Sequence, residues 1–220
     1  MGIPPLSRCC RRCRRPLASE AFFAHTSASA GWLGRRHVLC FGDSLTEGFC
    51  DHGRSFKPYS DQLLSRLQDL RVSASAGAAA AQPLPRVINA GVSGERSRQM
   101  LGRLPAFVRC ATGPAAGEDE DERPICGPLD VVLVLGGTND LFTLSAEEIV
   151  ENVLGLHRMV HQSGAVSGVL TVPDVRMGMD AELEPFKEEL EAINERLRDF
   201  AARNPGRSFL VDVAAAFPQD

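Results

Sequence analysis

A serine, a glycine and an asparagine in this sequence could together carry out acyl transfer. Ser44 closely follows the apolar run at 37–41, and Asn139 closely follows the run at 130–135. Gly94 lies a few residues after a third short run at 86–90. Acyl transfer needs a nucleophile beside donors that stabilise a developing oxyanion. A serine hydroxyl, an approachable glycine N–H and a side-chain amide supply these groups.

The elements around these residues predict how they come together. Short apolar runs indicate strands, and apolar residues at steps of three and four indicate helices. The two kinds of segment alternate, which favours a parallel sheet covered by helices on both faces. The carboxyl ends of parallel strands share one edge of the sheet. Strands are expected at 37–41, 86–90, 130–135, 166–172 and 208–213, with helices at 59–70, 97–108, 146–163 and 183–200.

Two helix starts have local signals in the sequence. Ser97 is expected to cap a helix that Pro105 then kinks. Ser145 and Glu148 have the spacing of a capping box, and Gly164 is expected to end the helix that they begin.

Three segments resemble the signature blocks of the GDSL, or SGNH, hydrolases. They are GDSLTEG at 42–48, NAGVSGERS at 89–97 and GGTNDL at 136–141. The resemblance extends from residue 37 to about residue 213 and is strongest to the small bacterial-type esterases and thioesterases. It implies a three-layer α/β/α flavodoxin-like domain over 37–220, with a five-stranded parallel sheet in the order 2-1-3-4-5.

The resemblance also implies roles for individual residues. Ser44 would be the nucleophile, and the backbone N–H groups of Ser44 and Gly94 would form an oxyanion hole with the side chain of Asn139. Asp43 would fix the turn and border the substrate. Met177 and Met179, after the fourth strand, either line an acyl pocket or pack on the helix below. The expected substrate is a small ester or thioester, with no metal and no cofactor.

One family block has no counterpart here. The family places Asp-x-x-His beyond the fifth strand, before a final helix, whereas this sequence reaches Asp220 with no histidine after it. Without a base, a serine hydroxyl is a poor nucleophile at neutral pH. Two hypotheses follow: a serine hydrolase whose full product carries the missing block and helix, or a non-catalytic isoform or binding module.

The histidines of the sequence offer few substitutes for that base. His52 lies in the loop after Ser44, where a solvated histidine is the simplest interpretation. His157 and His161 share one side of a helix, and their spacing could suit a metal. With no third ligand evident, a packed or surface pair is favoured.

A phosphate- or nucleotide-binding turn at Gly136-Gly137-Thr138 is a third hypothesis. It is weaker, because neither G-x-G-x-x-G nor a P-loop motif is present. The absence of G-x-S-x-G likewise excludes the usual nucleophile elbow of the α/β-hydrolases.

Composition separates a basic leader from an acidic body. Residues 1–36 carry seven arginines and one glutamate, so the remainder has a net charge of −10. Such a body argues against nucleic acid as a ligand. The leader has the composition of an organelle transit peptide or of a disordered extension. No apolar run approaches the ~20 residues of a membrane helix.

Seven cysteines, an odd number without metal-like spacing in the body, indicate reduced thiols. An intracellular location, cytoplasmic or organellar, is therefore expected. Residues 73–85 are expected to be an Ala-rich connector and residues 113–128 an acidic surface loop. The oligomeric state has no signal in the sequence.

Overall fold

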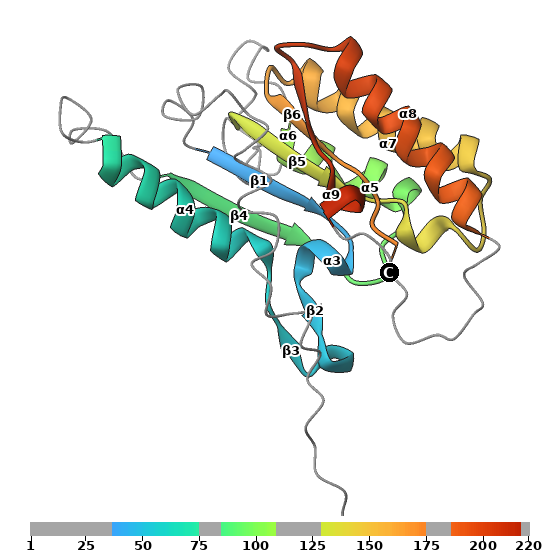
Figure 1. Cartoon of the computed structure of the whole chain (residues 1–220), viewed down its shortest axis with the longest axis horizontal. Coiled ribbons are helices and arrows are strands. Elements are labelled where there is room, and N and C mark those ends of the chain that lie inside the picture. Colours follow the sequence, from blue (N-terminus) through green and yellow to red (C-terminus); the bar gives the residue numbers. More distant parts are fainter. Residues whose placement is uncertain (1–36, 75–84, 109–128, 175–185, 217–220) are drawn as a thin grey trace, which may run out of the picture.

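A five-stranded parallel sheet with helices on both faces forms the centre of the molecule (Figure 1). The computed structural model describes residues 37–74, 85–108, 129–174 and 186–216. The strands are β1 (His37–Gly42), β4 (Arg86–Gly91), β5 (Val131–Leu135), β6 (Val166–Leu170) and β7 (Ser208–Val211). Their order in the sheet is β4-β1-β5-β6-β7. This confirms the predicted order, in which the second strand of the sheet lies outside the first.

The described helices around the sheet differ in length. The longer ones are α4 (Tyr59–Ala74), α5 (Ser97–Arg103), α7 (Ala146–Gln162) and α8 (Lys187–Arg203), and the short ones are α3 (Ser44–Glu47), α6 (Pro105–Val108) and α9 (Val213–Ala216). Two 3-10 turns, η2 (Asp51–Gly53) and η5 (Thr138–Asp140), lie between these elements. In these ranges, no helix has both the length and the apolar character needed to cross a bilayer.

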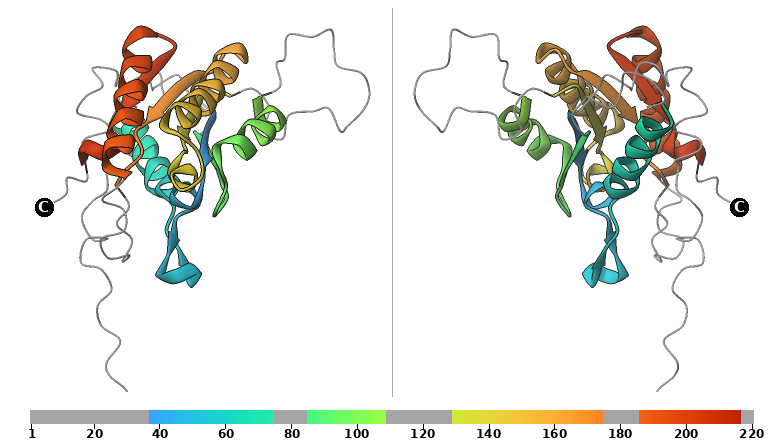
Figure 2. Two further views of the ribbon diagram at one scale, coloured as in Figure 1. Left: turned by 90° about the vertical axis from the view of Figure 1, so that its right-hand side faces the viewer. Right: turned by 90° about the vertical axis from the view of Figure 1, so that its left-hand side faces the viewer.

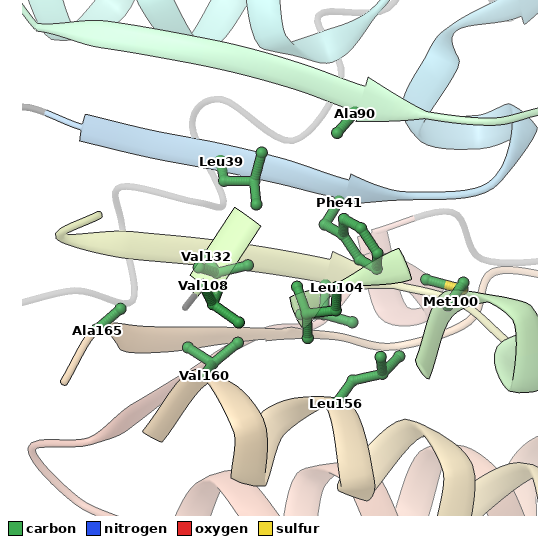
Figure 3. Packing of buried hydrophobic residues seen from close by; sticks show 11 residues of the cluster. Leu39, Phe41, Ala90, Met100, Leu104, Val108, Val132, Leu156, Val160 and Ala165 are labelled. Atoms are coloured by element: carbon green, nitrogen blue, oxygen red, sulfur yellow. The ribbon is translucent and has the colours of Figure 1, made fainter. Parts of the chain in front are cut away.

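Alternating residues of the central strands enter two separate cores. Leu39 and Phe41 of β1 pack with α5, α6 and α7, as Figure 3 shows. Val38 and Cys40 point to the other face, where Leu63 and Leu67 of α4 cover them. Both sets are fully or almost fully buried. A strand buried on both faces explains why the sequence has a near-continuous apolar run there.

The register of the sheet brings the ends of three strands level with one another. Gly42 at the end of β1 pairs with Gly91 of β4 on one side and with Leu135 of β5 on the other. The segments that begin at residues 43, 92 and 136 therefore leave the sheet side by side. This is the edge where the sequence predicts Ser44, Gly94 and Asn139.

The start of α5 differs from the prediction. Ser97 is the first residue of the helix and Arg96 its N-cap, so Ser97 is not the capping residue. The N–H of Ser97 donates to Asp140 Oδ2 at 2.9 Å, and its hydroxyl accepts from Asn152 at 3.0 Å. A distant carboxylate therefore takes the place of a local cap. The helix breaks before Pro105, as predicted, and continues as α6.

The other helix signals agree with the structure. Ser145 caps α7 and exchanges hydrogen bonds with Glu148, and the chain turns at Gly164 with a φ of 86°. The strands β6 and β7 are two residues shorter than predicted. After β6, both backbone groups of Val172 bond to the side chain of Asn194, at 2.7 and 2.9 Å. At this point the side-chain amide of Asn194 satisfies the backbone groups that a neighbouring strand would otherwise bind.

A small hairpin between α3 and α4 was not predicted. It consists of β2 (Phe49–Cys50) and β3 (Ser55–Phe56), joined by η2. Its base is closed by a bond of 2.7 Å from Lys57 N–H to the carbonyl oxygen of Gly48. Figures 1 and 2 show it extending away from the sheet. Strands of two residues have no readable period, which explains the omission.

Several predicted segments lie outside the described residues. They are the leader at 1–36, the acidic loop at 113–128 and positions 75–84 of the Ala-rich connector. The connector was placed too early, because α4 continues through Ala74.

Candidate active site

The turn that carries Ser44 begins where β1 ends. Asp43 caps the short helix α3 and accepts a hydrogen bond of 3.0 Å from the N–H of Leu45. Ser44 is the first residue of that helix, so its own N–H has no partner within the helix. A Cβ at Gly42 would lie 2.4 Å from the carbonyl oxygen of Leu135. Only glycine allows β1 to turn this close to β5.

The end of β4 is locked onto α3 by polar contacts. The side chain of Asn89 donates to the carbonyl oxygen of Thr46 at 2.7 Å and to the hydroxyl of Ser60 at 3.1 Å. Glu47 accepts bonds from the N–H of Ser93, at 2.9 Å, and from its hydroxyl. The turn after β4 is therefore held at a defined place beside Ser44.

Gly94 lies in that turn. Its φ is 76°, in the left-handed region that favours glycine, and there is open space where a Cβ would point. Gly94 is exposed, and its N–H makes no hydrogen bond to any residue that the structure describes. Within the described part of the chain, this N–H is therefore available to a ligand.

Asn139 comes from the third strand end, within η5. One N–H of its side-chain amide donates to the carbonyl oxygen of Glu95 at 2.9 Å. Asn139 is half-buried, and its amide carries a second N–H with no protein partner among the described residues. The bond to Glu95 holds this donor next to Gly94.

Ser44, Gly94 and Asn139 line one cleft with a volume of about 380 Å³. The structure therefore brings together the three residues that the sequence singled out. The rest of the described lining is mainly apolar. It comes from the same three turns, from the hairpin, and from the segments at 173–174 and 186–190. It comprises Leu45, Phe49, Ser93, Thr138, Leu141, Phe142, Pro173, Asp174, Phe186, Lys187 and Leu190.

The other predicted site residues lie elsewhere. Asp43 is fully buried and is not part of the described lining of the cleft. Its observed contact is with the turn, in keeping with a structural role. Met177 and Met179 lie outside the described residues, so their expected place beside the substrate stays a prediction.

A pair of buried carboxylates lies behind the cleft. Burial raises the pKa of Asp43 to about 6, opposed by the hydrogen bond from Leu45 and assisted by the negative charge of Asp140. Asp140 is also fully buried. One oxygen of each carboxylate has no hydrogen-bond partner of normal geometry. These two groups brace the turns that follow β1 and β5.

The histidines do not converge on Ser44 in the described part of the chain. His52 is exposed in η2 and is not among the residues that line the cleft. His157 and His161 are buried in α7, where each ring lies against Phe200. Their ring nitrogens contact the hydroxyls of Ser167 and Ser208. They are a packed pair.

The glycine turn after β5 makes room for the protein itself. A Cβ at Gly136 would lie 2.7 Å from the sulfur of Met100, and one at Gly137 would lie 2.9 Å from Ile149. Gly137 has a φ of 114°. Core packing and a backbone turn explain both glycines, so the sequence GGT gives no support to a phosphate site.

A protein-family comparison covers most of the chain. The model of the GDSL-like lipase/acylhydrolase family matches residues 40–220. The chain belongs to that family. The match confirms the resemblance predicted from the three sequence blocks. No curated protein matches the chain.

Several solved structures have the same fold. AlinE4, an SGNH-hydrolase esterase, is 24% identical with a TM-score of 0.52, over 80% of this chain and 75% of its own. TesA is 20% identical with a TM-score of 0.51, over 79% and 76%. A lipolytic G-D-S-L family member from Veillonella parvula is 16% identical with a TM-score of 0.51, over 80% and 76%. At these identities the likeness concerns the fold.

Several residues of the cleft had no signal that sequence reasoning could use. Phe49 reaches it from the unpredicted hairpin, and Phe142 and Phe186 meet there edge to face, with ring centroids 5.0 Å apart. Phe142 comes from a turn without a period. Phe186 belongs to the helical period predicted at 183–200 and is the N-cap of α8, but that period does not predict its contact with Phe142. The aromatic content of the GDSL-family cleft becomes visible only in three dimensions.

Proposed function

We propose that this chain is a serine hydrolase that cleaves carboxylic esters or thioesters through an acyl-serine intermediate. Ser44 is the nucleophile. Membership of the GDSL-like lipase/acylhydrolase family supports the class of reaction. The position of Ser44 in a cleft with Gly94 and Asn139 supports the choice of residues.

The observation that carries the proposal is a set of unused donors in one cleft. The N–H groups of Ser44 and Gly94 have no partners among the described residues, and Asn139 is anchored through only one of its two amide hydrogens. Donors fixed before the reaction stabilise an oxyanion without reorganising, and each can contribute a factor of about 10²–10³ to kcat. We assign these three donors to the oxyanion hole.

The reaction proceeds in two steps, acylation of Ser44 and hydrolysis of the acyl-serine. The hydroxyl oxygen of Ser44 bonds to the carbonyl carbon while the carbonyl π electrons move to oxygen, where the three donors bind the negative charge. Collapse of this intermediate breaks the bond to the alcohol or thiol, which leaves with the proton from Ser44. Water then attacks the acyl-serine by the same route, releasing the carboxylic acid and restoring the hydroxyl.

No described residue contacts the hydroxyl of Ser44 as a base. In the described ranges, the hydroxyl of Ser44 has no hydrogen bond to a histidine or a carboxylate. His157 and His161 are committed to Ser167 and Ser208 inside the core. His52 is the exposed histidine closest to Ser44 in sequence, and its substitution belongs in the test.

The cleft favours an apolar acyl group. Its described lining includes Leu45, Phe49 and Leu141 as well as the edge-to-face pair Phe142 and Phe186. Apolar walls with a few directed polar groups are typical of small-molecule sites. Asp43 positions the turn behind this lining, and Met177 and Met179 remain candidates for the acyl side.

The test is the hydrolysis of short p-nitrophenyl esters by the wild-type protein and by Ser44→Ala. Ser163→Ala, at the end of α7 and away from the cleft, is the matched control. We expect hydrolysis that Ser44→Ala abolishes and Ser163→Ala retains. His52→Ala then shows whether this histidine contributes.

Labelling gives an independent measurement of the same proposal. A fluorophosphonate should attach to the peptide that contains Ser44, as mass spectrometry detects. Hydrolysis that survives in Ser44→Ala contradicts the proposal. So does the absence of both hydrolysis and labelling, which would instead favour a non-catalytic protein.

A further inference from the structure

Arg103, at the end of α5, forms a paired contact with Glu95. Its Nε donates to one carboxylate oxygen at 2.7 Å, and its Nη2 donates to the other. The side chain of Glu95 is only 6% exposed and that of Arg103 is 24% exposed. A two-pronged contact of this kind fixes both the distance and the orientation of the partners.

The same guanidinium also reaches the end of β1. Its Nη2 lies 3.4 Å from the carbonyl oxygen of Gly42, which accepts a further bond of 3.0 Å from the N–H of Val92. Gly42 lies two residues before Ser44, and Glu95 directly follows Gly94. Arg103 thus connects the two turns that carry the backbone donors.

Aromatic rings hold the guanidinium in place. Its central carbon lies 4.2 Å from the centroid of the Phe41 ring and 5.7 Å from that of Phe107. Phe41 is fully buried and meets Phe107 edge to face. A cation over aromatic faces gains electrostatic attraction as well as packing. The position of Arg103 is therefore determined by the core of the domain.

Glu95 extends this connection to the third donor. Its carbonyl oxygen accepts the bond from the side-chain amide of Asn139 at 2.9 Å. Residue 95 therefore contacts Arg103 through its carboxylate and Asn139 through its backbone. A shift of this one residue would move Gly94 and Asn139 together.

We infer that Arg103 is a positioning residue that holds the three oxyanion donors in register through Glu95 and Gly42. This inference rests on the proposed function of the cleft. Without the guanidinium, the buried carboxylate of Glu95 loses its partner and moves toward water. Because donors act on the oxyanion and not on the ground state, the loss should fall on kcat. A displacement of 1 Å can cost roughly 100-fold in rate.

Kinetics of Arg103→Met and Arg103→Lys test this inference. We expect Arg103→Met to lower kcat by roughly 10- to 100-fold with KM changed less than about twofold. Arg103→Lys keeps the charge without the paired geometry and should recover part of the loss. Arg158→Met removes an exposed pair with Glu151 and serves as the matched control with unchanged kinetics.

A double substitution shows whether Arg103 acts through Glu95. If it does, Glu95→Gln combined with Arg103→Met should be no slower than Arg103→Met alone. A tetrahedral boronic acid should bind more weakly to Arg103→Met, while binding of the carboxylic acid product stays the same. A purely structural role would weaken both or neither.

NMR of the side-chain amide of Asn139 gives a readout that needs no activity. In Arg103→Met its resonances should shift and exchange faster, and in Arg158→Met they should not. Unchanged Asn139 resonances, or wild-type kcat in Arg103→Met, would overturn the inference. Absence of Ser44-dependent hydrolysis in the wild type overturns the proposed function, and the NMR result then still decides the role of Arg103.

Discussion

Asp43 and Asp140 are both fully buried, and the negative charge of Asp140 adds to the main effect, burial, in raising the pKa of Asp43. The two residues follow neighbouring strands, β1 and β5, and belong to different sequence blocks. Asp43 holds the turn of Ser44 and Asp140 holds the first N–H of α5. Two buried carboxylates thus support the turns that form the cleft.

Asp43 should make stability depend on pH. Its pKa is about 6 in the folded protein, against an ordinary value of 3.8. The folded state therefore holds a proton that the unfolded state has released, so stability falls as pH rises from about 4 to 6. Asp43→Asn removes this loss. Relative to wild type, the variant should gain up to about 3 kcal/mol between pH 4 and pH 7.5.

Urea unfolding at several pH values measures this effect. Asp199→Asn, from an exposed pair with Arg203, is the control and should show no such change. A difference between Asp43→Asn and wild type that is equal at pH 4 and pH 7.5 would contradict the expectation.

His157 should give the opposite dependence. Burial, with a smaller contribution from His161, lowers its pKa from 6.5 to about 3. Below pH 6.5 the unfolded state therefore binds a proton that the folded state does not bind, so stability decreases as the pH falls. His157→Asn keeps a polar contact for Ser167 without this titration. When the pH falls from 7 to 4.5, the free energy of unfolding of this variant should decrease by up to about 3 kcal/mol less than that of the wild type.

The midpoints of thermal unfolding at pH 7 and pH 4.5 provide the check. His52→Ala, an exposed substitution, should follow the wild type at both values. If His157→Asn lost as much stability as wild type on acidification, the proposed cause would be wrong.

Asn139→Ala should impair the rate of hydrolysis more than substrate binding. It removes one oxyanion donor and the bond to Glu95, so kcat should fall by about 10²–10³ while KM changes little. Asn204→Ala removes a comparable amide bond, to the carbonyl of Phe200 at the end of α8, and should leave kcat unaltered. Steady-state kinetics distinguish the outcomes, and a rise in KM alone would speak against the assigned role.

Two glycines of the second block should respond differently to alanine. A Cβ at Gly91 would lie 2.0 Å from the backbone nitrogen of Glu47, so Gly91→Ala must displace α3 and should cost about 3 kcal/mol or more. Gly94 has open space and a positive φ, so Gly94→Ala should cost only about 1–2 kcal/mol. Chemical denaturation measures both, and equal losses would refute this distinction.

The sequence predicted the sheet and the cleft well because both depend on short-range patterns. Buried parallel strands need apolar residues at every position, and the turns at their ends need glycine. Ser44, Gly94 and Asn139 were visible because each follows such a strand, whereas their roles and the order of the strands came from the resemblance to the family. The family match supports that resemblance. Their convergence follows from the topology alone.

The missed features depend on contacts between separate elements. Glu95 lies in the turn before α5 and Arg103 at the end of that helix, and no helix or strand period predicts their pairing. The contact between Phe142 and Phe186 joins two segments far apart in the chain. At α5, the carboxylate of Asp140 satisfies the N–H of Ser97, a tertiary substitute that local capping rules cannot foresee.

The hairpin between α3 and α4 is closed at its base by the bond from Lys57 to Gly48. The chain thus leaves the sheet and returns to almost the same place, so the two flanking helices do not depend on what the excursion contains. Phe49 nevertheless contributes a wall of the cleft. The sequence of this hairpin can therefore change, and with it one wall of the cleft, while the rest of the domain keeps its fold.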